Sequence, residues 1–207
     1  VLSGKSWLYK GISITYLKGH PSSYIHDFVH FPANIIEDGI HQKWAISDNY
    51  NTAELPDFIK PVNDSLETVA FMVIVNDSIQ FEKYWHGYSA DTMSNSFSMS
   101  KSWVSTLIGV AIKEGKIKSV DQKVCDFLPN FCEGRNTEVT IKNLLTMSSG
   151  LNWTEDYYNP IGQTSEAYYG NNLSGLMNSL KVVETPGKVF KYHSSCTQLL
   201  TFIVEAA

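Results

Sequence analysis

Two β-rich runs separated by a two-residue turn constrain the fold of this chain more than any other feature. Residues 68–75 (TVAFMVIV) form an apolar run rich in β-branched side chains, and residues 78–88 alternate in polarity. Asn76-Asp77 lies between the two runs and is typical of a tight turn. The sequence therefore predicts a β-hairpin, whose edges need cover from the rest of the chain.

Helical signals follow the hairpin. Residues 102–113 carry apolar side chains around most of the helical circumference, which predicts a buried helix, and Gly115 is a typical stop. A short helix is predicted over residues 140–147, with Thr140 as its N-cap, and a buried helix over residues 192–207. Helices packed on a hairpin predict an α+β fold.

The remaining segments carry weaker signals. Residues 1–60 are rich in aromatic residues, His and Pro, and predict an irregular lead-in with one helix near residues 52–62. Residues 152–175 hold Asn-rich turns and four tyrosines, and predict a long loop. We therefore expect a lead-in segment over residues 1–66 and one domain over residues 67–207.

Composition restricts the function classes. An apolar content of 43% and a charged content of 18% are typical of a globular chain of 207 residues. The net charge of −5, without a cluster of basic residues, gives no electrostatic footprint for nucleic acid. The apolar run near residues 102–113 is shorter than a membrane span requires.

A serine and a lysine stand three residues apart at the start of the buried helix. In Ser98-Met99-Ser100-Lys101, helical spacing places both side chains on one face. A serine hydroxyl is a weak nucleophile until an adjacent base takes its proton, and a lysine amine in a dry setting can be that base. The pattern therefore indicates nucleophilic catalysis, although the spacing alone is weak.

Several further motifs follow in a fixed order. They comprise the segments Glu114-Gly115-Lys116-Ile117, VCDFLP (124–129), VTIKNLLTMSSGL (139–151), Pro186-Gly187 and Tyr192-His193-Ser194. This series resembles the serine β-lactamase and penicillin-binding-protein superfamily, and is most similar to its class C-like esterases and 6-aminohexanoate-dimer hydrolases. The resemblance implies a β-lactamase/transpeptidase-like fold, with an antiparallel sheet flanked by helices.

The resemblance also implies residue roles. Ser98 matches the acylated nucleophile, Lys101 the lysine that exchanges its proton, and Tyr192 the tyrosine that works as general base and acid. Ser194 occupies the asparagine position of the family's Tyr-x-Asn motif, which favours ester or linear amide substrates over β-lactam antibiotics. The substrate cleft of the family is bordered by the region around Tyr157 and Tyr158. No cofactor and no metal are implied.

The family's third motif, Lys-Thr-Gly or His-Thr-Gly on a strand after the tyrosine motif, has no match in the sequence. We therefore expect an N-terminal portion of the domain, apparently truncated, that lacks the strand supplying one oxyanion donor. The superfamily is often found in the cell envelope, so an extracytoplasmic location is expected, with a possible membrane anchor upstream of Val1.

Two other functions stay open. A chain of this fold can lose activity and serve as a binding protein, which a missing third motif would favour. His26-Asp27-Phe28-Val29-His30 resembles the His-Glu-x-x-His pattern of zinc hydrolases, but the acid is shorter and Pro32 would end a helix early.

The sequence holds three cysteines. Cys125 and Cys132 are close enough to form a small disulfide bridge, or are two free thiols. Cys196 lies on an apolar helix and is predicted to be a buried thiol.

Overall fold

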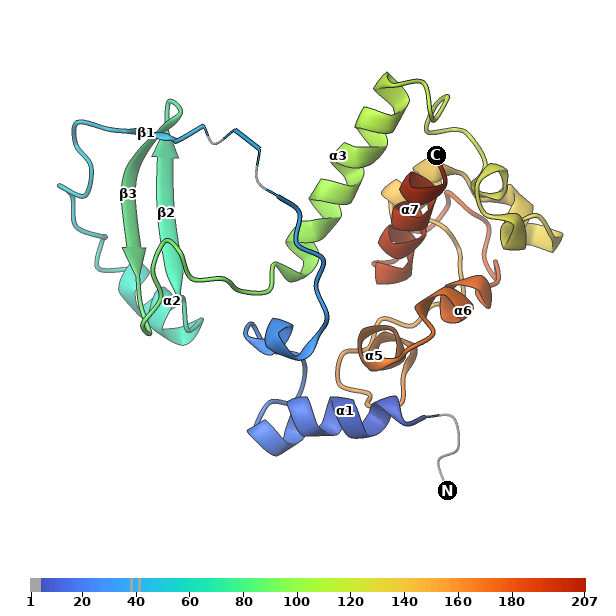
Figure 1. Cartoon of the computed structure of the whole chain (residues 1–207), viewed down its shortest axis with the longest axis horizontal. Helices are drawn as coiled ribbons and strands as arrows, with labels where there is room; N and C mark the ends of the chain where they lie inside the picture. The colour runs from blue at the N-terminus through green and yellow to red at the C-terminus, as the bar shows by residue number, and fades with distance from the viewer. Residues whose placement is uncertain (1–4, 38, 41) are drawn as a thin grey trace. The chain divides into compact units, whose positions relative to one another are not determined.

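The chain divides into two compact units (Figure 1). The computed structural model describes residues 5–37, 39–40 and 42–207. The first unit comprises residues 1–30 and 95–207, and the second comprises residues 31–94. The boundary predicted between residues 66 and 67 falls inside the second unit, and the domain limits stay a prediction.

The second unit holds a three-stranded sheet in the order β1-β3-β2. Strands β2 (Ala70–Val75) and β3 (Ser78–Tyr84) pair antiparallel, which confirms the predicted hairpin. Asn76 and Asp77 both adopt positive φ, at 48° and 59°, as the tightest hairpin turns require. The two-residue strand β1 (Ala45–Ile46) pairs in parallel with β3, an addition that the predicted antiparallel sheet did not include.

Two predicted boundaries in this unit are wrong. Strand β3 ends at Tyr84 rather than residue 88, because His86 and Gly87 turn the chain with φ of 55° and 78°. Helix α2 spans Ile59–Ser65 rather than residues 52–62. Pro56 explains this shift, since the residue before a proline is held out of the helical region.

The first unit is helical. Its α-helices are α1 (Trp7–Ile14), α3 (Ser100–Lys113), α4 (Ile141–Leu145), α5 (Gln163–Tyr169), α6 (Leu173–Asn178) and α7 (Ser194–Ala206). Short 3-10 helices are η1 (Tyr16–Lys18), η2 (Asp27–His30), η3 (Phe97–Met99), η4 (Val124–Asp126), η5 (Pro129–Phe131) and η6 (Gly134–Glu138). The helices predicted over residues 102–113, 140–147 and 192–207 are confirmed as α3, α4 and α7.

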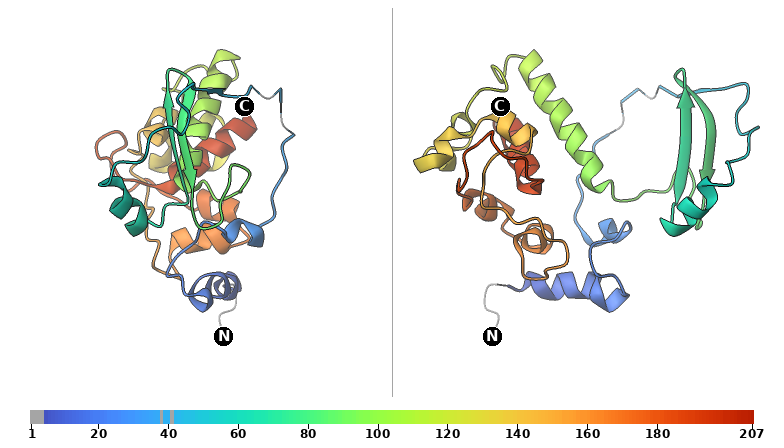
Figure 2. Two further views of the ribbon diagram at one scale, coloured as in Figure 1. Left: turned by 90° about the vertical axis from the view of Figure 1, so that its left-hand side faces the viewer. Right: turned by 180° about the vertical axis from the view of Figure 1, so that it is seen from behind.

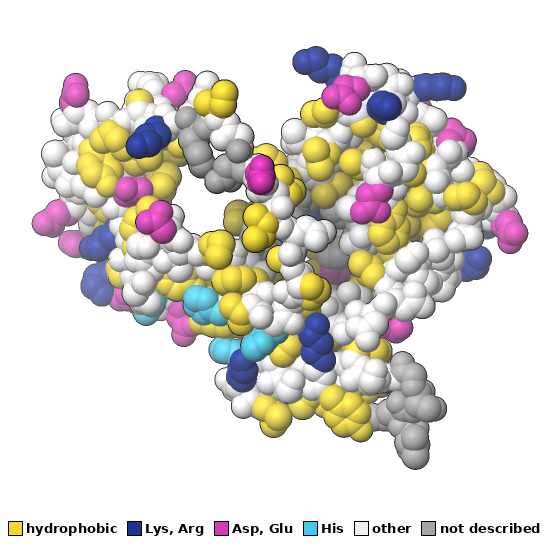
Figure 3. Space-filling model, in the orientation of Figure 1, with side chains coloured by type: hydrophobic (Ala, Val, Ile, Leu, Met, Phe, Trp, Pro, Cys, Tyr) yellow, Lys and Arg dark blue, Asp and Glu magenta, His cyan; other side chains and the backbone are white. Residues whose placement is uncertain are grey.

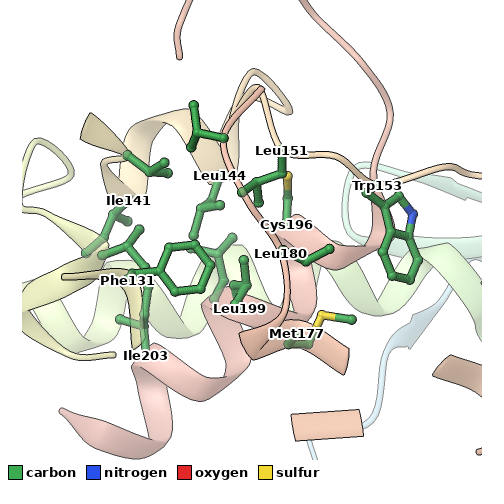
Figure 4. Packing of buried hydrophobic residues seen from close by; sticks show 14 of the residues in the cluster. Phe131, Ile141, Leu144, Leu151, Trp153, Met177, Leu180, Cys196, Leu199 and Ile203 are labelled. Carbon is green, nitrogen blue, oxygen red and sulfur yellow. The ribbon is translucent and has the colours of Figure 1, made fainter. Parts of the chain in front are cut away.

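Helix α7 organises the core of this unit. It packs against α3 and α4, and α1 packs against α5 (Figures 1 and 2). Figure 4 shows the side chains between these elements, with Trp153 at one edge of the cluster. Fully or nearly fully buried members of the cluster include Ile108, Phe131, Ile141, Leu144, Met177, Leu180, Cys196, Leu199 and Ile203.

Three helical predictions in this unit need correction. Helix α1 lies in the predicted irregular lead-in, α5 lies inside the predicted loop over residues 152–175, and α6 begins inside it. Helix α3 is not buried all round: Ile108 is 1% exposed, but Trp103, Leu107 and Val110 are 73%, 48% and 44% exposed. These three residues share one helical face, and the apolar composition of a helix does not tell which of its faces neighbours cover.

Cys125 and Cys132 are joined in a disulfide, the first of the two possibilities that the sequence left open. Cys196 is buried and free, as predicted. Within the described ranges, every helix falls short of the length and hydrophobicity that a membrane span needs. Lysine and arginine side chains are spread among acidic ones over the face drawn in Figure 3.

Candidate active site

Ser98 lies at a strained entry to a helix. It is the middle residue of η3, which runs directly into α3, and its side chain is exposed. Phe97, immediately before it, has a φ of 44°. A bulky residue rarely adopts this left-handed conformation, and such outliers often occur at functional sites. The backbone therefore presents Ser98 at a sharp turn at the N-terminal end of a helix.

The Ser98 hydroxyl contacts both of its predicted partners. Lys101 Nζ lies 3.0 Å from Ser98 Oγ, one helical turn away, and the Tyr192 hydroxyl donates a hydrogen bond to the same oxygen at 2.7 Å. Lys101 Nζ also lies 5.1 Å from the centre of the Tyr192 ring, within cation–π range. The structure thus brings together the three residues that the sequence predicted as catalytic.

Backbone hydrogen bonds before Tyr192 and helix packing after it fix the position of this residue. The Lys191 N–H donates to the Met147 carbonyl at 2.8 Å, and the Gly187 N–H donates to the Ser148 carbonyl at 2.7 Å. These bonds tie the chain before Tyr192 to the segment that follows α4. Helix α7 begins two residues later and packs against α3, which carries Lys101. Tyr192 thereby reaches Ser98 across 94 residues of sequence.

A carboxylate joins the predicted loop to helix α7. Glu155 accepts hydrogen bonds from the backbone N–H and the hydroxyl of Ser194, both at 2.6 Å. It also accepts bonds from Tyr157 Oη at 2.6 Å and Trp153 Nε1 at 2.7 Å. Because Ser194 is the first residue of α7, the carboxylate also lies at the positive end of that helix.

Glu155 stands in an acidic and aromatic cluster of the sequence with Tyr157 and Tyr158, but was not predicted as a site residue. Trp153 and Tyr157 stand two positions before and after it, and side chains at that spacing in an extended segment point to one side. An acid flanked in this way by two aromatic donors is a signal that could have indicated a hydrogen-bonded, half-buried carboxylate. Its contact with Ser194, 39 residues away, has no such local signal.

This network shifts the acidity of its members. Burial opposes the ionisation of Glu155, but the hydrogen bonds from Ser194, Tyr157 and Trp153 outweigh it and hold the pKa of Glu155 below its ordinary value. Burial and the bond to Glu155 raise the pKa of Tyr157 to about 12. Burial also lowers the pKa of His193, next to Tyr192. Glu155 is therefore ionised and Tyr157 and His193 are neutral at pH 7.

A cavity of about 460 Å³ opens beside Ser98. Ser98, Lys101, Tyr157 and Ser194 all line it, together with side chains from α1, α5, α6 and α7. Its volume is in the range of small-molecule sites. The Ser194 hydroxyl, already bonded to Glu155, thus belongs to both the network and the cavity wall.

The other predicted positions lie elsewhere. Tyr158 is 70% exposed and is not part of the cavity lining, although its carbonyl accepts a bond from Tyr16. His26 lies before η2, while His30 lies within it and contacts Lys18 Nζ at 2.8 Å. Across the described residues, no three His, Cys, Asp or Glu side chains gather as a metal ion would require. The zinc alternative therefore has no geometric support in the described part of the chain.

Comparison with known proteins identifies the family of this chain. The Beta-lactamase family matches residues 55–207, about three quarters of the chain, so the chain belongs to that family. Among curated relatives, a 6-aminohexanoate-dimer hydrolase from Paenarthrobacter ureafaciens is 27% identical over 161 residues, which cover 73% of this chain and 41% of that enzyme.

Solved structures show the same fold. A protein assigned as a 6-aminohexanoate-dimer hydrolase from Bacillus anthracis superposes with a TM-score of 0.70 at 19% identity, over 97% of this chain and 56% of that one. A class C beta-lactamase in complex with cefoxitin gives 0.54 at 22% identity, over 72% of this chain and 42% of that one. The fold is thus that of β-lactamases and penicillin-binding proteins, and the chain spans about half the length of these relatives.

Proposed function

We propose that this chain carries the nucleophilic site of a serine hydrolase that cleaves an ester or amide through an acyl-enzyme on Ser98. One observation carries the proposal: Ser98 Oγ is within hydrogen-bond distance of both Lys101 Nζ and Tyr192 Oη, at 3.0 Å and 2.7 Å. A nucleophile in hydrogen-bond contact with groups that can take its proton is the signature of covalent catalysis.

The reaction has two halves. Ser98 Oγ attacks the carbonyl carbon of the substrate while its proton passes to the Tyr192–Lys101 pair. The tetrahedral intermediate collapses, the bond to the leaving alcohol or amine breaks, and the leaving group takes that proton. Water then attacks the acyl-Ser98 ester, gives a proton to the same pair, and releases the acid as Ser98 Oγ recovers its proton.

Developing negative charge on the carbonyl oxygen needs hydrogen-bond donors. The backbone N–H of Ser98 lies in the first turn at the start of a helix, where the dipole favours an anion. Removal of one such donor in other hydrolases costs roughly 10²–10³ in turnover, so this N–H matters for rate. The strained φ of Phe97 supports the proposal because it fixes the direction of the Ser98 backbone.

Within this class we propose ester or linear amide substrates rather than β-lactam antibiotics. The position where β-lactam-recognising relatives have an asparagine is occupied by Ser194, whose hydroxyl donates to Glu155. That hydroxyl is shorter than an amide and is already engaged. The name of the Paenarthrobacter relative, a 6-aminohexanoate-dimer hydrolase, is consistent with a linear amide.

Labelling of the full-length protein with a fluorophosphonate tests the proposal. We expect one adduct per chain, which mass spectrometry locates on Ser98, and no adduct in Ser98→Ala. Ser105→Ala, an exposed position on α3, is the matched control and should label normally. Tyr192→Phe should lower the hydrolysis rate of a nitrophenyl acetate by roughly 10²–10⁴-fold, the usual contribution of a general acid–base group.

Two outcomes contradict the proposal. An adduct on another residue, or one that persists in Ser98→Ala, would move the nucleophile elsewhere. A folded full-length protein that neither labels nor turns over the ester would favour the non-catalytic binding protein instead.

We also propose an extracytoplasmic location. The Cys125–Cys132 disulfide supports it, because disulfides persist mainly in oxidising compartments.

A further inference from the structure

The cavity beside Ser98 has an unusual charge distribution. Among its lining residues, all of them in the described part of the chain, Lys101 is the one residue of the Lys, Arg, His, Asp and Glu types. Lys101 lies at the reacting end, 3.0 Å from Ser98 Oγ. The rest of the wall offers aromatic rings, aliphatic side chains, neutral hydroxyls and the amide of Gln198. A group extending away from Ser98 therefore meets no charged partner.

Helix α1 builds one wall of this cavity. Leu8 and Ile12 line it from α1, and Tyr16 lines it from η1. Helix α1 packs against α5, whose Tyr169 lies so close to Gly11 that a Cβ there would be 3.0 Å from its ring. These residues precede residue 55, where the match to the Beta-lactamase family begins. The wall therefore lies outside the region that the Beta-lactamase family matches, although the Bacillus anthracis structure superposes over 97% of the chain.

The opposite walls come from α6 and α7. Leu173 and Met177 lie on α6, and Thr197 and Thr201 lie on successive turns of α7. These side chains are apolar or carry a neutral hydroxyl. A volume of about 460 Å³ admits a chain of several carbons beyond the scissile group.

We propose that this cavity binds an uncharged, largely apolar group of the substrate, attached to the scissile ester or amide. Helix α1 gives the protein this specificity. The inference rests on the proposed function, because the apolar group of the substrate is taken to be joined to the ester or amide that Ser98 attacks. A charged end group would lose its hydration in the cavity without gaining a partner, and buried unpaired charges are strongly disfavoured.

Binding to the inactive Ser98→Ala chain tests this without relying on turnover. The ligands are butanamide, hexanamide and octanamide, with 6-aminohexanamide and the monoamide of adipic acid as charged counterparts. Dissociation constants are measured by calorimetry. We expect the neutral series to tighten by about fourfold per methylene, the effect of burying one such group, and both charged ligands to bind at least tenfold more weakly than hexanamide.

A substitution on α1 links the specificity to that helix. Ile12 lines the cavity and is 39% exposed, so Ile12→Asp should fold and place a carboxylate at the wall. It should weaken hexanamide and strengthen 6-aminohexanamide, reversing their order. Tyr9→Asp adds the same charge to the same helix at a position that is 69% exposed and does not line the cavity, and should leave both dissociation constants unchanged.

The inference fails if affinity is independent of chain length, if the charged amides bind as tightly as hexanamide, or if Tyr9→Asp acts like Ile12→Asp. If Ile12→Asp does not fold, the dissociation constants of butanamide, hexanamide and octanamide decide whether the inference holds. Failure of the proposed function is a separate result, since it shows as absent Ser98 labelling and absent hydrolysis of nitrophenyl acetate by the unmodified chain.

Discussion

At the residue scale, Glu155 and Ser98 have complementary roles. Ser98 accepts contacts from Lys101 and Tyr192, which can move protons. Glu155 accepts contacts from Ser194 and two aromatic side chains, and these bonds fix the start of α7 next to Tyr192. Glu155 touches no group that we expect to react, so it is a positioning residue. Its carboxylate matters through the geometry that it imposes.

Glu155→Gln should destabilise the fold. A glutamine would turn an amide group toward donors that need acceptors, and partly buried donors left unpaired cost about 1 kcal/mol. Urea unfolding at pH 7 measures the loss, and the exposed Glu205→Gln on α7 is the matched control. The folded-state pKa of Glu155 lies below its ordinary value of 4.5, so its contribution is fully present above that value.

The same variant gives a pH signature. As pH falls below 4.5 and through the folded-state pKa of Glu155, the carboxylate is protonated and its advantage over glutamine declines. The difference in unfolding free energy between the two chains should therefore shrink in acid. A difference that stays constant from pH 7 to the acid range would show that ionisation of Glu155 is not what stabilises the network.

At the element scale, local chemistry decided which helices the sequence could predict. Helices α3, α4 and α7 have apolar periodicity and clear end signals, and were predicted within a few residues of their bounds. Helices α5 and α6 are only seven and six residues long and contain tyrosines and asparagines of modest helix propensity. Short helices of this kind form through tertiary packing, which a local pattern does not contain.

Helix α4 offers a direct test of local determination. Thr140 Oγ1 accepts a bond from the Asn143 N–H at 3.2 Å, and Asn143 Oδ1 accepts one from the Thr140 N–H at 3.0 Å, a reciprocal capping box. Thr140→Ala removes half of it and should lower the unfolding free energy by about 1 kcal/mol. Thr106→Ala, inside α3, keeps every cap and should be nearly neutral. Equal losses in both variants by urea titration would contradict the capping account.

At the scale of the whole molecule, the site divides into a part that sequence predicts and a part that it does not. The Ser98–Lys101 contact follows from three-residue spacing on a helix. The role of Tyr192 came from the family resemblance alone, because nothing local indicates a partner 94 residues away. Helix α1 in the cavity wall was missed entirely, since the lead-in has weak periodicity.

The cysteines give a prediction for the intact chain. After denaturation without reductant, titration with a thiol reagent should find one free thiol, Cys196, and three after reduction. In the native chain Cys196 should react slowly, because burial raises its pKa to about 11 and excludes the reagent. Three thiols in the unreduced, denatured chain would remove the disulfide and its support for an extracytoplasmic location.

The 94-residue separation of Ser98 and Tyr192 also sets when the nucleophile can become reactive during biosynthesis. Lys101 leaves the ribosome almost together with Ser98, but at about 5–20 residues per second Tyr192 follows roughly 5–20 s later. Until that tyrosine arrives and α7 packs on α3, the hydroxyl lacks half of its proton-transfer partners. Labelling of Ser98 should therefore begin only after this contact forms, and its onset during refolding reports the last long-range contact of the site.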